Sequence, residues 1–276
     1  MAGVLAAKPV WRSSLVAGVV CFALLVVAAL FAPQISPHDP LAQNLAADLE
    51  SPSVEHPFGR DKLGRDQLSR LIYGARVSLE VGIITVTISL LIGVFLGAAA
   101  GFAGGAVDYW IMRLVDVLLA FPGILLAVAM SAVLGPSLSN VIIALSLLGW
   151  TGYARLVRAE VLGISKREHV EAATALGVPS LRIVARHILP LLGAPLAVQA
   201  TFGMAGAIVA EASLSFLGLG VQPPTPSWGA MINEGRHFLL VAPHLTFYPG
   251  IAILVTVLGL NFLGDGLRDW LDVRAR

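Results

Sequence analysis

Hydrophobic residues gather in six long runs, and the segments between these runs hold most of the charged residues. A helix of about 20 apolar residues crosses the hydrocarbon layer of a membrane, which is about 30 Å thick. The runs cover residues 15–32, 77–100, 111–134, 138–157, 194–219 and 245–263. The pattern therefore predicts an all-α membrane protein with six transmembrane helices.

The first run, residues 15–32, follows Lys8 and Arg12, as the core of a secretory signal does. A signal core is only about 7–15 residues long. This run is longer, so we expect a retained first transmembrane helix. The chain then divides into an N-terminal segment (1–14), the first helix (15–32), an outer loop with an amphipathic helix (33–76), a core of five transmembrane helices (77–265) and a C-terminal tail (266–276).

Composition supports a membrane location. Hydrophobic residues make up 57% of the chain and charged residues 13%, and the mean hydropathy is +0.84. Soluble domains carry about 25% charged residues, so this chain has too few to cover a soluble fold. The net charge of +1 gives no basic surface for nucleic acid. Cys21 is the only cysteine and can form no internal disulfide.

The positions of Lys and Arg predict the orientation, because cytoplasmic loops are enriched in both. With the N-terminus in the cytoplasm, most of the 18 Lys and Arg residues fall on the cytoplasmic side, many of them between positions 155 and 186. Both termini are then cytoplasmic. Segments 33–76 and 221–244 are then extracytoplasmic.

The outer segment has two parts. Residues 33–57 are rich in Pro, His and acidic residues, which is typical of a loop. Residues 58–76 have apolar positions at helical spacing and two opposite-charge pairs four residues apart, Asp61 with Arg65 and Asp66 with Arg70. This pattern predicts an amphipathic helix on the membrane surface.

The longest cytoplasmic loop, residues 158–192, predicts two short helices with a sharp corner. Ser165 and Glu168 have the spacing of a capping box at the start of the first helix. Gly177 suits a left-handed helix end. Pro179 suits the first turn of the second helix, and Pro190 is expected to end it.

Small residues form a stripe along the first of these short helices, at Val170, Ala173, Thr174 and Gly177. Another protein could approach this stripe closely. The alternative is that the loop folds onto its own bundle. The pattern of residues leaves both interpretations open.

A motif in this loop resembles the EAA loop of ATP-binding-cassette (ABC) importer permeases. Its residues are Glu171, Ala172, Ala173, Gly177, Leu189 and Pro190. His187 stands where that family usually has Ile, which is similar to the variant in dipeptide and oligopeptide permeases. Further similarity extends over residues 59–66, 69–76, 214–220, 222–229 and 264–269. Asp272 is followed by Val273 rather than by the usual Pro.

The resemblance is to the "C" permease of the dipeptide, oligopeptide and nickel family. It implies a pore subunit in a bacterial inner membrane that works with a second, non-identical permease, two ATP-binding subunits and an extracytoplasmic binding protein. The six motif residues are then implied to couple the permease to the ATPase. ATP and Mg²⁺ belong to the partner subunits, and this chain is expected to bind no cofactor. Di- and oligopeptides are the implied cargo, with nickel, glutathione and haem as alternatives.

Weakly polar residues within the predicted spans are candidates for the lining of the pore. They are Gln199, Thr201, Met204 and Ser146, together with Thr85 and Ser89. Glu211 is the one acidic residue in its run. A buried acid in a membrane usually pairs or faces water, so Glu211 is either a gate residue or a structural hydrogen-bond acceptor near the outer mouth.

Gly93, Gly97 and Gly101 recur every four residues in the second run, a spacing that predicts close helix packing. The sequence has no G-x-x-x-x-G-K-[ST], H-E-x-x-H or G-x-S-x-G motif, so we expect no enzyme activity. The six histidines lack metal-ligand spacing, and no metal site is predicted. An ion-coupled transporter is a remote alternative that predicts several intramembrane ionisable residues.

Overall fold

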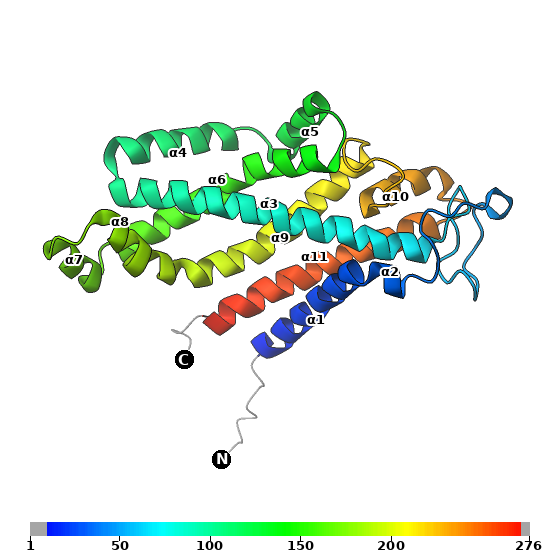
Figure 1. Cartoon of the computed structure of the whole chain (residues 1–276), viewed down its shortest axis with the longest axis horizontal. Helices are drawn as coiled ribbons and strands as arrows, with labels where there is room; N and C mark the ends of the chain where they lie inside the picture. The colour runs from blue at the N-terminus through cyan, green and yellow to red at the C-terminus, as the bar shows by residue number, and fades with distance from the viewer. Residues whose placement is uncertain (1–9, 272–276) are drawn as a thin grey trace, which may run out of the picture.

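The computed structural model describes residues 10–271, which form helices joined by short turns and one long loop (Figure 1). The longer helices are α1 (Val10–Leu30), α3 (Gln67–Ala103), α4 (Gly105–Leu119), α5 (Gly123–Leu134), α6 (Leu138–Ile164), α9 (Gly193–Phe216) and α11 (His244–Leu271). The shorter ones are α2 (Ala32–Ile35), η1 (Leu45–Ala47), α7 (Glu168–Ala175), α8 (Ser180–Ile183), η2 (Val184–Ile188), η3 (Leu189–Leu192), α10 (Trp228–Gly235) and η4 (Arg236–Phe238). Residues 10–271 contain no β-strand, which confirms the all-α prediction. Lys8 and the end of the predicted tail, residues 272–276, lie outside the described residues.

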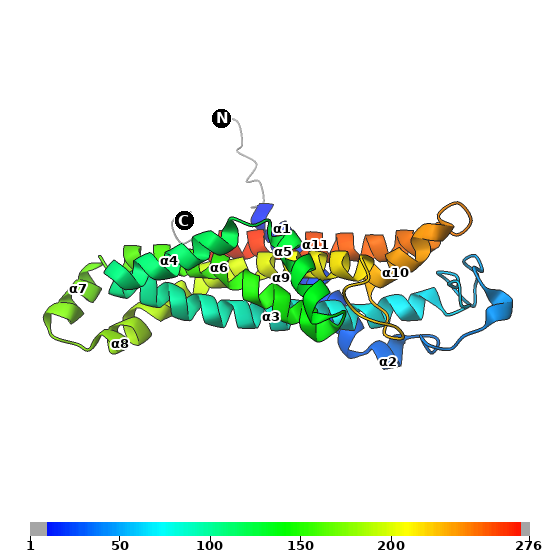
Figure 2. The same ribbon diagram turned by 90° about the horizontal axis from the view of Figure 1, so that it is seen from above.

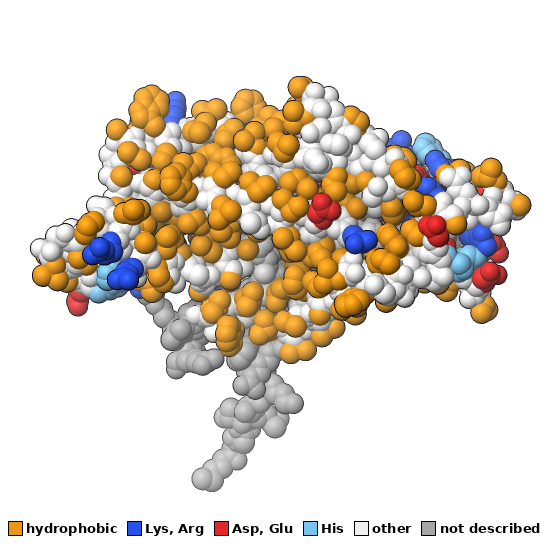
Figure 3. Space-filling model, in the orientation of Figure 1, with side chains coloured by type: hydrophobic (Ala, Val, Ile, Leu, Met, Phe, Trp, Pro, Cys, Tyr) orange, Lys and Arg blue, Asp and Glu red, His pale blue; other side chains and the backbone are white. Residues whose placement is uncertain are grey.

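The longer helices other than α5 lie side by side along the long axis of the molecule (Figures 1 and 2). Helices α7 and α8 lie at one end, called the α7 end here, and α10 lies with the loop of residues 36–66 at the other, called the α10 end. Hydrophobic side chains cover the middle of the face in Figure 3, and most Lys, Arg, Asp and Glu on that face gather at the two ends. This distribution fits a bilayer that crosses the middle of the bundle.

Five helices of the described chain are long and apolar enough to cross a membrane, and a sixth span exists only if α4 and α5 count as one. These two helices meet at an angle of 83°. The predicted span over 111–134 is therefore not one straight helix, because it bends between α4 and α5. Pro122 is the N-cap of α5, and a residue before Pro is disfavoured in the helical conformation, so the chain turns there.

Helix α3 has 37 residues and is one continuous helix, about 55 Å long at 1.5 Å per residue. The prediction of a separate surface helix over 58–76 is wrong. Residues 58–66 belong to the loop, and the helix begins at Gln67 because the Asp66 carboxylate accepts a hydrogen bond from the Ser69 amide at 2.7 Å. The apolar stripe of residues 68–75 is the first part of this helix.

Candidate functional site

A central cavity of about 300 Å³ lies between α3, α5, α6 and α9. Its lining consists of small and apolar side chains with four polar ones and no charged one. The lining residues are Thr85, Val86, Ser89, Gly123, Ile124, Ala127, Leu145, Leu148, Gly149, Tyr153, Gln199, Gly203, Gly206, Ala207 and Ala210. Such a surface can contact ligands of varied shape without a strong preference for charge.

Helices α6 and α9 approach each other closely beside this cavity. The Tyr153 hydroxyl donates a hydrogen bond to the Gln199 carbonyl oxygen at 3.4 Å. A Cβ atom on Gly203 would lie only 2.3 Å from the Tyr153 hydroxyl oxygen. The glycine therefore makes room for the phenol ring, and the hydroxyl joins the two helices where both line the cavity.

A second and larger cavity of about 1050 Å³ lies toward the α7 end, between α6, α9 and α11, and is called the end cavity here. It is more polar, because its lining includes Glu160, Arg167 and Arg268. Gln199 lines both cavities. The two cavities therefore adjoin at Gln199, and together they extend along the bundle from its middle toward the α7 end.

The structure separates the predicted pore residues into two groups. Gln199 lines both cavities, and Thr85 and Ser89 line the central one. The others point elsewhere and line neither cavity: Ser146 is buried and its carbonyl accepts from Ser89, Thr201 contacts Gly264 of α11, and Met204 packs into the core against Gly82.

Glu211 also lines neither cavity and has no exposed surface. Its carboxylate accepts a hydrogen bond from the Ser215 hydroxyl at 2.6 Å, and the Ser215 oxygen accepts from the Val221 amide at 3.1 Å. The pair thus secures the turn through which the chain leaves α9. Of the two roles predicted for Glu211, this geometry favours the structural one.

The loop between α6 and α9 turns at Gly177, as the sequence predicts. Gly177 has φ +76°, a left-handed value that costs little only for glycine. Its amide donates to the Thr174 carbonyl at 3.0 Å, and the Val178 amide donates to the Ala173 carbonyl at 3.1 Å. These two bonds form a Schellman motif, which ends α7.

Two other predictions for this loop are wrong. There is no capping box, since the N-cap of α7 is Arg167 and the buried Ser165 hydroxyl has no hydrogen-bond partner within the described residues. Pro190 does not end the second short helix. A π-turn (Val184–Ile188) is followed by a 3₁₀ turn that holds Pro190, and the chain passes into α9 without leaving the helical conformation.

Only half of the stripe predicted for partner docking faces outward. Val170 and Ala173 are buried against residues of α6 and α8, including Ile164 and Ile183. Thr174 and Gly177 of the same stripe are exposed, as are Glu171 and Ala172, whereas Leu189 is half-buried and Pro190 exposed. The alternative, in which the loop folds onto its own bundle, is correct for the buried half of α7.

Two exposed apolar side chains at the α7 end were not predicted from the sequence. Leu176 is 84% exposed and Leu181 is 82% exposed. They flank the Gly177 turn and lie on the same loop as the exposed Glu171. The sequence did contain a signal for this exposure. A leucine next to a sharp turn has few neighbouring residues to pack against, so it is expected to remain exposed. Together these side chains give the loop a mixed apolar and acidic outer surface.

Gly93, Gly97 and Gly101 pack α3 against α6. A Cβ atom on Gly97 would lie 2.6 Å from the Ala154 carbonyl oxygen and 2.8 Å from Val157 Cβ. The corresponding positions on Gly93 and Gly101 are equally crowded, at 2.4 Å and 2.9 Å from atoms of α6. The glycines thus allow these two long helices to lie in close contact beside the central cavity.

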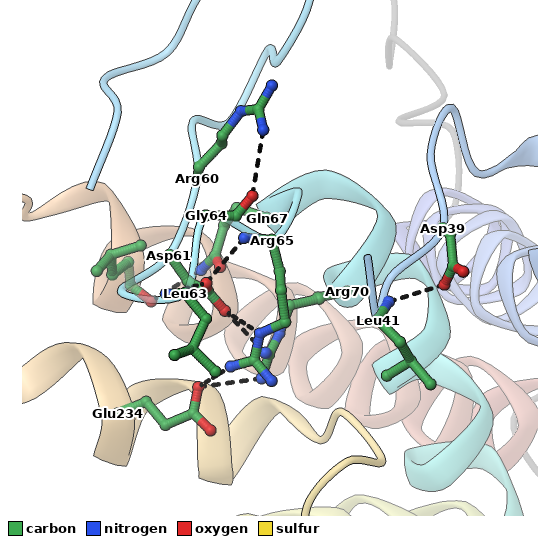
Figure 4. Close-up of polar contacts among 11 residues, drawn as sticks. Asp39, Leu41, Arg60, Asp61, Leu63, Gly64, Arg65, Gln67, Arg70 and Glu234 are labelled. Carbon is green, nitrogen blue, oxygen red and sulfur yellow. Dashed lines mark hydrogen bonds and ion pairs between the residues drawn. The ribbon is translucent and has the colours of Figure 1, made fainter. Parts of the chain in front are cut away.

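At the α10 end, four charged side chains form a cluster that Figure 4 shows in detail, called the quartet here. Asp61 accepts from Arg65 and Arg70, each at 2.7 Å, and Glu234 of α10 accepts from the same two arginines at 2.9 and 3.1 Å. The predicted pair of Asp61 with Arg65 is present. The predicted pair of Asp66 with Arg70 is wrong, because Arg70 turns to Asp61 and Glu234.

The quartet joins the loop, α3 and α10, and its charges balance. Burial raises the pKa of Glu234 above its usual value, although Arg65 opposes this effect. Asp66 behaves differently. Burial acts to raise its pKa too, but hydrogen bonds from Ser69 and His56 outweigh that effect and hold the pKa below its usual value.

Comparison with known proteins gives two family matches. Residues 93–276 match the family of binding-protein-dependent transport system inner membrane components. Residues 13–52 match the N-terminal transmembrane domain of oligopeptide transport permease C. Among solved structures, the inward-facing MetNI methionine ABC transporter is similar, with a TM-score of 0.59 and 19% identity over 72% of this chain and 95% of that chain. That likeness supports the fold.

Similar curated proteins include a dipeptide transport system permease of Alkalihalophilus pseudofirmus, which is 44% identical over 95% of this chain and 86% of that protein. A glutathione transport system permease of Escherichia coli is 47% identical over 92% of this chain and 84% of that protein. A di/tripeptide transport system permease of Pseudomonas aeruginosa is 44% identical over 98% and 92%. The chain therefore belongs to the family of binding-protein-dependent transport system inner membrane components, and it is a permease subunit of the ABC importer type.

Proposed function

We propose that this permease forms half of the pore through which an ATP-driven importer moves di- and oligopeptides. The observation that carries the proposal is the pair of adjoining cavities that share Gln199. Peptides differ in side chain and in charge, so the middle of their path should contain few charged groups of its own. The central cavity has an uncharged lining of mostly small residues, which suits such cargo.

The coupling role proposed for the loop rests on its connection to α9. Glu171 and Ala172 face outward, where a partner can contact them. Gly177 sets the angle of the next segment, and the turns that hold Leu189 and Pro190 continue directly into α9. Since α9 lines both cavities, a movement of the loop can be transmitted to the pore. Ala173 contributes by anchoring the loop to its own bundle.

The partners follow from this arrangement. Two ATP-binding subunits, with ATP and Mg²⁺, would contact the α7 end, and this chain would bind no nucleotide and catalyse no reaction itself. A second, non-identical permease would complete the pore. An extracytoplasmic binding protein would deliver cargo at the α10 end. The support is the sequence, which has no phosphate-binding loop, and the mixed outer surface of the α7 end.

The orientation belongs to the same proposal. We place the α7 end and both chain termini in the cytoplasm and the α10 end outside, in a bacterial-type inner membrane. Arg155, Arg158, Arg167, Arg182 and Arg186 lie in and near the loop at the α7 end. This charge bias fits a cytoplasmic location.

Glutathione is the second candidate cargo, because a relative with 47% identity is a glutathione transport permease. Glutathione is itself a small peptide-like molecule, so the same cavity chemistry suits both candidates. Nickel and haem remain cargo alternatives from the sequence. An ion-coupled mechanism has less support, since Glu211 is held in a structural hydrogen bond.

Uptake by a strain that lacks this permease tests the proposal. The strain would carry the wild-type chain or a Gly206→Phe variant, and labelled dipeptide, tripeptide, glutathione, nickel and haem would be offered in turn. Gly206 lines the central cavity, and a Cβ atom on it meets no other atom within 4 Å. Phe at this position should fill the cavity and abolish peptide uptake.

Gly250→Phe is the matched control, because Gly250 lines neither cavity and also has open space around it. That variant should transport like the wild type. Equal uptake by both variants would refute the central cavity as the path. If the wild-type chain restores uptake of nickel or haem but not of peptides, peptides are not the cargo.

A further inference from the structure

Two histidines and a glutamate from separate parts of the outer loop meet beside the start of α3. One ligand atom each from His38, Glu55 and His56 lies within 4.8 Å of the others. The ring centroids of the two histidines are 4.4 Å apart. Sequence spacing could not predict this cluster, because the fold of the loop brings His38 back to the other two residues.

His56 is buried, and its tautomer follows from its two partners. Arg60 can only donate, so the His56 Nε2 that lies 2.5 Å from Arg60 Nη2 accepts that hydrogen bond. The proton is therefore on Nδ1, which donates to the Asp66 carboxylate at 2.8 Å. A carboxylate behind one ring nitrogen, with the lone pair on the other, is how proteins orient a metal-binding histidine.

Arg60 places a positive charge at the lone pair of His56. Its Nε also lies 3.0 Å from the Glu50 carboxylate. When a metal ion takes the His56 lone pair, the guanidinium can turn fully to Glu50. Arg60 is therefore a competitor for the same nitrogen atom and already has a second partner.

His38 supplies the second imidazole. Its buried Nδ1 has no hydrogen-bond partner within the described residues, and the nearest carboxylate oxygen, on Asp66, is 3.7 Å away. A buried polar atom without a partner costs free energy. A metal ion bound by His38 would also bring Glu55, which is exposed and free to turn, into the same site.

We propose that His38, His56 and Glu55 bind one divalent transition-metal ion of the zinc class at the α10 end. Imidazole and carboxylate groups suit Zn²⁺, Ni²⁺ and Cu²⁺. Three protein ligands leave the ion one open position. The ion ties the segment of residues 36–40 to the loop in front of α3. The site is separate from the cavities, so it does not depend on the identity of the cargo.

Zinc binding by the full-length chain, purified in detergent with a tag that contains no histidine, tests this site. A colorimetric chelator competes for Zn²⁺, and Co²⁺ absorption reports on the ligand geometry. Glu55→Gln and His38→Gln should each weaken Zn²⁺ binding by at least about tenfold, as expected for groups in a metal site. Arg60→Gln should strengthen binding, because it removes the competing guanidinium.

His237→Gln is the control, since His237 is an exposed histidine at the same end of the molecule. It should bind Zn²⁺ as the wild type does. Glu55 is exposed, so its variant should fold normally. The proposal is overturned if Glu55→Gln and His38→Gln bind Zn²⁺ as tightly as the wild type, or if the wild type binds none. Loss of Zn²⁺ binding in the His237→Gln variant would also overturn the proposal, because the ion would then be bound at His237 and not at the proposed site.

Discussion

The two ends of the bundle use charged residues in opposite ways. At the α10 end the charges turn inward: Asp61, Arg65 and Arg70 are 4%, 4% and 2% exposed and neutralise one another with Glu234. At the α7 end the inward positions are apolar, and Glu171 faces outward beside Leu176.

The difference indicates at which end the side chains already have their interaction partners within this chain. A buried group of opposite charges has its partners already, so the quartet gives the α10 end a rigid shape. The α7 end has its apolar side chains divided between its own core and its outer surface. Leu176 and Leu181 are therefore open to a partner, in contrast to the paired charges of the quartet. Substitutions at the α10 end should therefore mainly lower the stability of the protein, and substitutions at the α7 end should mainly lower its transport activity.

The largest effect on stability should come from Asp61→Asn. The change leaves Arg65 and Arg70 with one buried carboxylate between them, and loss of one member of a buried ion pair costs about 3–5 kcal/mol. The apparent midpoint of thermal unfolding in detergent should fall sharply, and protease should cut the loop of residues 36–66 faster. Asp48→Asn, at an exposed position of the same loop, should change neither value. An unchanged midpoint for Asp61→Asn would refute the structural role of the quartet.

Gly97→Val should have the next largest effect. Its new side chain would meet the Ala154 carbonyl oxygen 2.6 Å from Cβ, and overpacking of this kind costs about 1–3 kcal/mol. The thermal midpoint should fall, and transport should fall with it because α3 and α6 both line the central cavity. Gly163→Val, in α6 with open space around it, is the control for valine in a helix. If both variants are equally stable, close packing at Gly97 is not needed.

The hydrophobic pattern predicted most of the fold, because a span of apolar residues has few alternatives in a membrane. It failed at Pro122, where a hydrophobic run continues through a bend that local stereochemistry imposes. It failed again at residues 58–76, where the apolar spacing and the charge pairs predicted an amphipathic helix on the membrane surface. Those charges are buried, and one partner, Glu234, is far away in the sequence, so local spacing could not reveal it.

The site was predicted less completely than the fold. Gly177 was predicted correctly because a left-handed turn strongly favours glycine. The pore candidates on α9 were separated only by the structure, since the sequence does not say which face of α9 borders a cavity: Gln199 lines both cavities, whereas Thr201 and Met204 pack against other helices. The exposure of Leu176 was not predicted, because the sequence alone does not show which face of the loop packs against the bundle and which faces outward.

Gly177→Val should have a smaller effect on stability, about 1–2 kcal/mol, because a β-branched residue is strained at φ +76°. The side chain itself has room, since nothing lies within 4 Å. The strain should rotate the segment after α7 and reduce transport without removing the protein from the membrane. Membrane abundance and peptide uptake are the two measurements. Gly163→Ala, at a helical glycine with equal space, should leave both unchanged.

Glu234 should give the α10 end a weak dependence on pH. Its pKa is raised in the folded state, so between its usual pKa and the raised one the folded protein binds more protons than the unfolded protein. Stability should therefore fall as pH rises through that window. Glu234→Gln should remove this slope in the thermal midpoint, whereas Glu168→Gln, at an exposed position of α7, should keep it. A slope that persists in Glu234→Gln would assign the effect to another group.

Glu171→Lys should have the smallest effect on stability and a large one on transport. Glu171 is exposed on α7, and the buried contacts of that helix come from Val170 and Ala173, so the fold loses no packing when the charge is reversed. The thermal midpoint and membrane abundance should stay at wild-type values. Peptide uptake should be lost, because the reversed charge lies where the ATP-binding subunit is proposed to contact the loop.

The same charge reversal at Glu50 is the control that distinguishes a specific effect at Glu171 from a general effect of changing the net charge. Glu50 is also exposed but lies at the α10 end, where it pairs with Arg60 at 3.0 Å. Glu50→Lys should preserve uptake and co-purification of the ATP-binding subunits, whereas Glu171→Lys should lose both. If Glu171→Lys transports at the wild-type rate with those subunits still bound, the loop is only a connection between α6 and α9. The contrast between a self-contained α10 end and a partner-binding α7 end would then have no functional meaning.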